Sequence, residues 1–260
     1  MPQIAVPAHL YMSAPVATVT AGTRLSDAWQ RLDERQISSL AVVDAGGQPV
    51  GVITRSDLLR IGRREAGARG DVALLELPDR PVADAMTTGI RSVAPADPVS
   101  TAAALMNRHD IHRVFVVDGG SLAGVISTLD VMRAIRDDRQ RTPIAEHMSK
   151  PLFTVRVEDP LSLAAERLAE AHITGLVVME NDWPVGVFTQ LEEVAAKDLP
   201  PSTPVEEAMN AAFVCLPEST PLHRAAEQAI AMRVRRIIAV RHRGPIGILT
   251  GLDFAHAAHD

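Results

Sequence analysis

The sequence indicates a mixed α/β protein built from four copies of one βαββα unit. One motif occurs four times, as "GVITRSDLL", "GVISTLDVM", "GVFTQLEEV" and "GILTGLDFA". In this phrase a glycine and apolar residues are followed by a hydroxyl residue and, three positions later, a carboxylate. The hydroxyl positions are separated by 73, 62 and 61 residues, and so regular a period is typical of a repeat architecture. A second marker keeps the same register. A methionine with a proline five residues before it precedes each unit, at Met12, Met86, Met148 and Met209.

Each unit begins with a short extended segment, as in "VATV" (16–19), "IRSV" (90–93) and "LFTV" (152–155). A helix follows. In "DPVSTAAALMNRHD" (97–110) an Asp-Pro start precedes apolar residues at helical spacing. Two apolar strands, "RVFVVD" and "LAGVIS", are then separated by the hairpin signal "GGS". The hydroxyl residue and the carboxylate open the last helix, so the predicted order is β, α, β, β, α.

Composition limits the class of protein. A chain of 260 residues that is 47% apolar can bury a substantial core. Its net charge of -6, without a dense basic run, argues against a general nucleic-acid surface. The first residues show no signal-peptide pattern, and no apolar stretch approaches membrane-spanning length, so we expect a soluble cytoplasmic protein. The single cysteine, Cys215, is expected to be a small buried hydrophobic residue.

One unit is too small to bury both faces of its hairpin, so we expect the units to pair. The predicted pairs are residues 1–138 and residues 139–260. The linker from "LLRIGRREAGARG" to "PDRP" is about a dozen residues longer than the other linkers between units. Its Gly-rich and Arg-rich middle favours a solvated loop, and a phosphate-binding or partner-binding arm is the alternative.

The hydroxyl residue and the carboxylate three positions later have two interpretations. They form a capping box, which satisfies the amides of the first helical turn. They also suit a ligand, because a helix N-terminus attracts phosphate and a carboxylate can accept hydrogen bonds from a ribose. Three repeats use Asp, whereas a capping box prefers the longer Glu or Gln. We therefore expect the aspartates to have a role besides capping.

The stretch "MTTGIRSVAPADPVSTAAALMNRHDIHRVFVVDGGSLAGVISTLDVM" resembles a cystathionine β-synthase (CBS) domain from end to end, and all four units match this pattern. The resemblance implies two Bateman modules, each a pair of CBS repeats whose clefts commonly bind adenosine compounds. The plan of four repeats is similar to that of the regulatory subunit of AMP-activated protein kinase.

In that family the aspartate of the last helix contacts the ribose, and the hydroxyl residue before it helps to hold phosphate. The resemblance assigns these roles to three pairs, namely Thr54 and Asp57, Ser127 and Asp130, and Thr250 and Asp253. The third repeat departs from the pattern. Its Thr189 is paired with Glu192, whose extra methylene moves the carboxylate and puts ribose binding there in doubt.

Basic residues before the second strand commonly reach the phosphates of a neighbouring ligand in this family. The resemblance assigns that role to two pairs of residues, His112 with Arg113 and Arg235 with Arg236. The first repeat has Ser38-Ser39 at this position and the third has Thr174-Gly175, so neither brings a positive charge.

These residues predict a non-catalytic regulatory module that binds AMP, ADP or ATP, the last with Mg²⁺, and signals to an unidentified partner protein. Four alternatives remain open: a sensor of S-adenosylmethionine, NAD or a cyclic dinucleotide, a ligand-free interaction scaffold, an enzyme, and a homodimer in place of a single-chain disc. No metal site is expected, because His109-x-x-His112 and His256-x-x-His259 lack further ligands.

Overall fold

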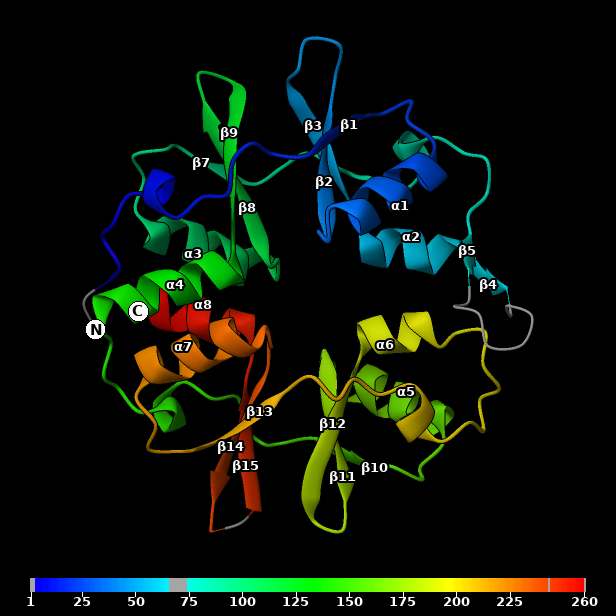
Figure 1. Ribbon diagram of the computed structural model, residues 1–260, viewed down its shortest axis with the longest axis vertical. Coiled ribbons are helices and arrows are strands. Elements are labelled where there is room, and N and C mark those ends of the chain that lie inside the picture. Colours follow the sequence, from blue (N-terminus) through cyan, green and yellow to red (C-terminus); the bar gives the residue numbers. More distant parts are fainter. Residues whose placement is uncertain (1–2, 66–73, 243, 260) are drawn as a thin grey trace.

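The computed structural model describes residues 3–65, 74–242 and 244–259, and one chain arranges all four repeats in a ring (Figure 1). The first repeat lies beside the second, the second faces the fourth, and the fourth lies beside the third. The N- and C-termini lie close together, next to the helices of the second and fourth repeats.

The predicted order β, α, β, β, α is confirmed in every repeat. The first repeat comprises β1 (Thr18–Thr20), α1 (Leu25–Glu34), β2 (Ser39–Val43), β3 (Pro49–Thr54) and α2 (Arg55–Ile61). The second comprises β7 (Ser92–Val93), α3 (Val99–His109), β8 (Arg113–Asp118), β9 (Ser121–Ser127) and α4 (Thr128–Asp138). The third comprises β10 (Thr154–Arg156), α5 (Leu161–Glu170), β11 (Gly175–Glu180), β12 (Trp183–Thr189) and α6 (Gln190–Ala195). The fourth comprises β13 (Val214–Pro217), α7 (Leu222–Met232), β14 (Ile237–Arg241), β15 (Gly244–Leu249) and α8 (Gly251–His259).

Each repeat folds its three strands in the same way. The first strand pairs in parallel with the second, and the second pairs in antiparallel with the third. A parallel pair needs a crossover connection, which the first helix of each repeat provides. The third strand of the hairpin then ends directly at the N-terminus of the last helix. This geometry places the hydroxyl residue and the carboxylate at equivalent points of all four repeats.

The methionine and glycine markers of the sequence meet across repeat pairs. The segment that leads into the first repeat packs on the second, where Met12 lies against Gly124, and Met86 lies in turn against Gly51 of the first repeat. The third and fourth repeats exchange Met148 and Met209 in the same way. A Cβ added to Gly247 would lie 2.5 Å from the sulfur of Met148, so only glycine leaves room for the methionine.

Each of the four leading segments contains a short 3-10 helix preceded by a proline, namely η1 (Ala8–Leu10), η2 (Val82–Asp84), η3 (Ile144–Glu146) and η4 (Val205–Glu207). A short strand, β6 (Thr87–Thr88), extends the sheet of the first repeat. The long linker contains β4 (Arg63–Glu65) and β5 (Leu74–Glu76), which pair in antiparallel. The predicted loop itself, residues 66–73, lies outside the described residues.

The apolar core is distributed unevenly around the ring. One continuous cluster joins α3 and α4 of the second repeat to α7 and α8 of the fourth. The first and third repeats have separate clusters. Each of these clusters also includes residues of the segment that leads into the neighbouring repeat, the second or the fourth. In the described part of the chain, no helix is long and apolar enough to cross a membrane.

Candidate functional site

The hydroxyl residue and the carboxylate form a capping box at the start of the last helix in the first three repeats. In the first repeat the amide and hydroxyl of Thr54 both donate to Oδ2 of Asp57, at 2.9 and 2.6 Å. Thr250 donates to Oδ2 of Asp253 in the same way, at 2.6 and 2.7 Å. The shorter Asp therefore completes the capping box, and the general preference for Glu or Gln does not exclude it. The strand end before the helix is extended, which brings the Asp carboxylate close enough to reach the capping amide.

Capping occupies only one of the two oxygens of each aspartate, and the second oxygen differs between repeats. Oδ1 of Asp130 accepts from Arg133 at 2.6 Å, and this carboxylate is almost fully buried. Oδ1 of Asp253 accepts from Ser149 at 2.7 Å. Oδ1 of Asp57 meets only Arg60, at 3.5 Å, and the arginine side chain is 66% exposed. Asp57 therefore has the least engaged oxygen of the three.

Sequence reasoning did not identify these partners of the second oxygen. Arg60 and Arg133 each follow their aspartate by three residues, a helical spacing that could have been recognised. Ser149 follows Met148, and Asn210 follows Met209, so both reach the carboxylate from the exchanged leading segment. Ser149 and Asp253 are 104 positions apart in the sequence, so no local pattern predicts their contact.

The third repeat contains its own capping box, and its carboxylate is already satisfied. The amide of Thr189 donates to Oε2 of Glu192 at 3.1 Å, and its hydroxyl bonds to the same oxygen. Oε1 of Glu192 accepts from the side-chain amide of Asn210 at 3.3 Å. The carboxylate is buried and interacts favourably with the charge of Arg236.

The four basic residues predicted to bind phosphate come together between the second and fourth repeats. His112 interacts electrostatically with Arg113, Arg235 and Arg236. Burial, together with the nearby Arg235, lowers the pKa of Arg113 to about 10. Burial by the surrounding protein and the Arg113 charge also lower the pKa of His112, although the residue keeps part of its surface exposed. Among the described residues, no ion pair involves any of the four.

Arg113 extends from the second repeat to the first. Its guanidinium donates to the hydroxyl of Ser38 at 2.8 Å. The next residue, Ser39, is paired with Thr54 in the β2–β3 ladder, and the amide of Arg55 bonds to the Ser38 carbonyl at 3.0 Å. We call the group formed by Ser38, Thr54, Asp57 and Arg113 the Thr54 site. It combines a cation from one repeat with a hydroxyl and a carboxylate from its partner.

Other features of the chain take no part in these groups. A pocket of about 610 Å³ lies at the tips of the first two hairpins, and none of the predicted ligand residues lines it. Among the residues that the structure describes, no group of three or more His, Cys, Asp or Glu side chains could hold a metal ion. Cys215 is half-buried, and burial raises the pKa of its thiol.

Solved structures share the fold of the whole chain. Protein MJ1225 of Methanocaldococcus jannaschii, described as a candidate archaeal homologue of g-AMPK, aligns with 97% of this chain and 99% of its own, at 18% identity and a TM-score of 0.75. An uncharacterised conserved protein of Pyrococcus horikoshii aligns with 97% of this chain and 100% of its own, at 18% identity and a TM-score of 0.69. At this identity the likeness shows the fold alone.

Relatives in sequence match part of the chain. The CBS domain-containing protein YhcV of Bacillus subtilis is 31% identical over 108 residues, which are 41% of this chain and 77% of YhcV. A homoserine O-acetyltransferase of Methanocorpusculum labreanum is 33% identical over 101 residues, or 38% of this chain. The match spans only 20% of that enzyme.

The family model for the CBS domain matches four segments, residues 8–64, 82–137, 144–192 and 205–260. These segments cover the four structural repeats and nearly the whole chain. CBS domains of this kind are regulatory modules rather than catalytic ones. The chain belongs to the CBS domain family, with four repeats in one polypeptide.

Proposed function

We propose that the protein is a regulatory module that binds adenine nucleotides, with the Thr54 site as its principal site and AMP as the ligand that fits it best. The observation that carries this proposal is the position of Arg113. Its half-buried guanidinium faces other cations, has one hydroxyl as its hydrogen-bond acceptor, and belongs to no ion pair among the described residues. A buried cation without a counter-ion is unfavourable, and a phosphate would supply that counter-ion.

The ribose would be bound by the free oxygen of Asp57. Its Oδ2 is fixed by the amide and hydroxyl of Thr54, so the carboxylate is held in one orientation before any ligand arrives. Its Oδ1 faces only the exposed Arg60, which a ligand can displace at little cost because exposed ion pairs contribute little free energy. Both hydroxyls of a ribose could then donate to one charged oxygen.

The phosphate would lie between Arg113 and the hydroxyl residues of the first repeat. Arg113 already contacts the hydroxyl of Ser38, and the Ser38 carbonyl accepts from the amide of Arg55, the residue after Thr54, so the guanidinium lies close to the N-terminus of α2. Arg235 and Arg236 would add positive charge nearby, because Arg235 interacts with both Arg113 and Arg236, and His112 interacts with all three arginines. Longer phosphate chains, as in ADP or ATP with Mg²⁺, would extend towards them.

The other pairs would bind more weakly. Asp130 is buried and its second oxygen bonds to Arg133, and Asp253 gives its second oxygen to Ser149, so a ribose must displace a stronger contact. In the third repeat Glu192 is buried, both its oxygens accept hydrogen bonds, and its charge interacts favourably with Arg236. We therefore expect the Thr189 position to be empty.

Titration calorimetry on the full-length protein tests the proposal. AMP should bind more tightly than adenosine, because only AMP brings the anion. Asp57→Asn should weaken both ligands by roughly 10-fold to 150-fold, because it removes charge-assisted hydrogen bonds worth about 1.5 to 3 kcal/mol. Arg113→Met should weaken AMP and leave adenosine nearly unchanged. Arg108→Met, an exposed arginine on α3, is the control and should change neither.

The same variants separate the alternative ligands. S-adenosylmethionine has a ribose but no phosphate, so its affinity should depend on Asp57 and not on Arg113. Equal losses of AMP and adenosine in Arg113→Met would contradict the phosphate role. Absence of binding of AMP, ADP, ATP, NAD, S-adenosylmethionine and cyclic dinucleotides would favour a scaffold that signals to its partner without a ligand.

A further inference from the structure

The contact between the first and third repeats differs in kind from the contact opposite it. The second and fourth repeats share one continuous apolar core, built from α3, α4, α7 and α8. Between the first and third repeats α2 meets α6, and the cores of these two repeats are separate. Apolar burial therefore holds one side of the ring, and a smaller contact closes the other side.

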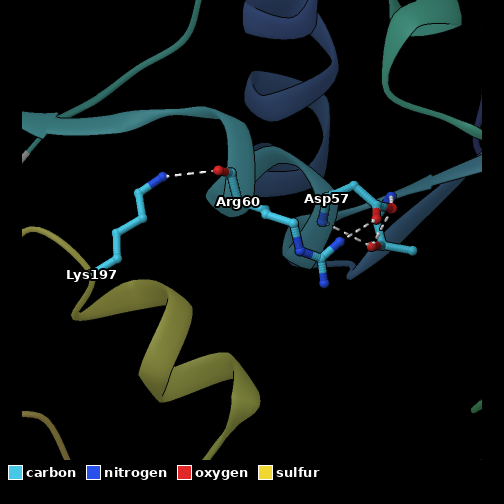
Figure 2. A network of polar contacts seen from close by, with 4 residues as sticks. Asp57, Arg60 and Lys197 are labelled. Atoms are coloured by element: carbon cyan, nitrogen blue, oxygen red, sulfur yellow. Dashed lines mark hydrogen bonds and ion pairs between the residues drawn. The ribbon is translucent and has the colours of Figure 1, made fainter. Parts of the chain in front are cut away.

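One lysine provides the polar bonds of that smaller contact. Lys197 follows α6, and its ammonium donates to the carbonyls of Leu59 at 2.7 Å, Arg60 at 3.1 Å and Gly62, at the C-terminus of α2. Figure 2 shows the lysine side chain extended from the third repeat to the Arg60 carbonyl of the first. These carbonyls end a helix, where the chain leaves them unpaired and a cation is favourable.

The choice of residue fits this geometry. The chain contains only two lysines, Lys150 and Lys197, and every other permanently charged basic side chain is an arginine. An ammonium is a compact charge whose three donors can point at three converging carbonyls. Gly62 also allows close packing here, because an added Cβ would lie 2.7 Å from the side chain of Leu75 in β5.

We propose that the α2–α6 contact is a seam that opens and closes, with Lys197 as its latch and the core of the second and fourth repeats as its hinge. Opening breaks three hydrogen bonds to carbonyls that water can solvate, and it exposes no shared apolar core. Separating the second repeat from the fourth would expose buried helix faces such as those of Met106, Met132 and Phe254. The ring therefore opens on the side of the first and third repeats.

The two lysines allow a direct test on the full-length protein. The protein is treated with a limiting amount of an amine-acetylating ester, and the acetylation of each lysine is measured by peptide mass spectrometry. Both lysines are exposed residues, but only the Lys197 ammonium is held by three carbonyls, so Lys150 serves as the internal reference. We expect Lys197 to react at least tenfold more slowly than Lys150. Equal rates would overturn the latch, because they would mean that its ammonium is free in solution.

Hydrogen exchange then distinguishes a lysine that holds the first and third repeats together from one that only caps α2. In Lys197→Met, peptides from both α2 and α6 should exchange severalfold faster, while peptides from α3 and α8 stay unchanged. Lys150→Met is the matched control and should resemble the wild type. Faster exchange in α2 alone would reduce Lys197 to a cap and overturn the seam. Equal acceleration in α3 and α8 would overturn the hinge.

Discussion

Replacing Arg113 with methionine should stabilise the ligand-free protein while it weakens AMP binding. The guanidinium has a pKa lowered to about 10 by burial and then by Arg235, so its charged form lies in an unfavourable environment. That decrease corresponds to roughly 3 kcal/mol, because one pKa unit is worth about 1.4 kcal/mol. Methionine removes the charge and retains apolar contacts, but it loses the Ser38 hydrogen bond, worth about 1 kcal/mol. We expect a net gain of about 1 to 2 kcal/mol in the free energy of unfolding.

The sign of this effect follows from the direction of the pKa shift. A cation whose folded pKa is lowered destabilises the fold at every pH below that folded pKa, here about 10, and the penalty disappears as the pH rises above it. Urea unfolding at pH 7, without nucleotide, measures the gain, and Arg108→Met is the control, expected to stay within about 0.5 kcal/mol of the wild type. A destabilised Arg113→Met protein would refute the claim that this arginine lacks a counter-ion.

Three other predictions concern the third repeat, His112 and the exchanged methionines. A crystal structure with AMP should show an empty Thr189 position, and a ribose found on Glu192 would contradict our interpretation of that repeat. The wild type should bind AMP more tightly than His112→Gln, and this difference in affinity should grow as the pH falls from about 7.5 to 6. The reason is that burial and Arg113 hold the pKa of His112 below its usual value, whereas a bound phosphate raises it. If calorimetry finds the same difference at every pH, the charge of His112 has no role in binding. Gly247→Ala should lower the free energy of unfolding by about 1 to 3 kcal/mol, because the added methyl group overpacks against Met148. In a Met148→Ala background the same substitution should cost less. If urea unfolding shows that the two changes in free energy simply add, the two residues do not compete for space.

The repeat architecture could be predicted from the sequence because its signals are local. Hairpin punctuation, helical spacing and the hydroxyl-x-x-carboxylate phrase each lie within one unit, and all occur four times. The ring order could not be predicted, because it depends on which helix faces are apolar after folding. Likewise, Met148 and Gly247 could be recognised as markers, but their contact joins residues that are about a hundred positions apart.

The candidate site was predictable in part for the same reason. The capping role of Thr54 follows from spacing, and the structure adds that Asp caps as well as Glu does. The different surroundings of the second oxygens were not predictable. Ser149 and Asn210 reach their carboxylates from exchanged segments, and Arg113 reaches Ser38 across the pair. Such long-range contacts give equivalent residues unequal chemistry, and they make the Thr54 site our first choice among four similar ones.

The shared core of the second and fourth repeats means that the cooperative units of this protein need not follow the order of the chain. Its helices α3 and α4 precede α7 and α8 by more than eighty residues, yet the four form one apolar cluster. During gradual denaturation these helices should melt together, after the first and third repeats. A cut between residues 138 and 139 would leave each half with an uncovered helical face, and such a fragment should recruit a second copy to cover it.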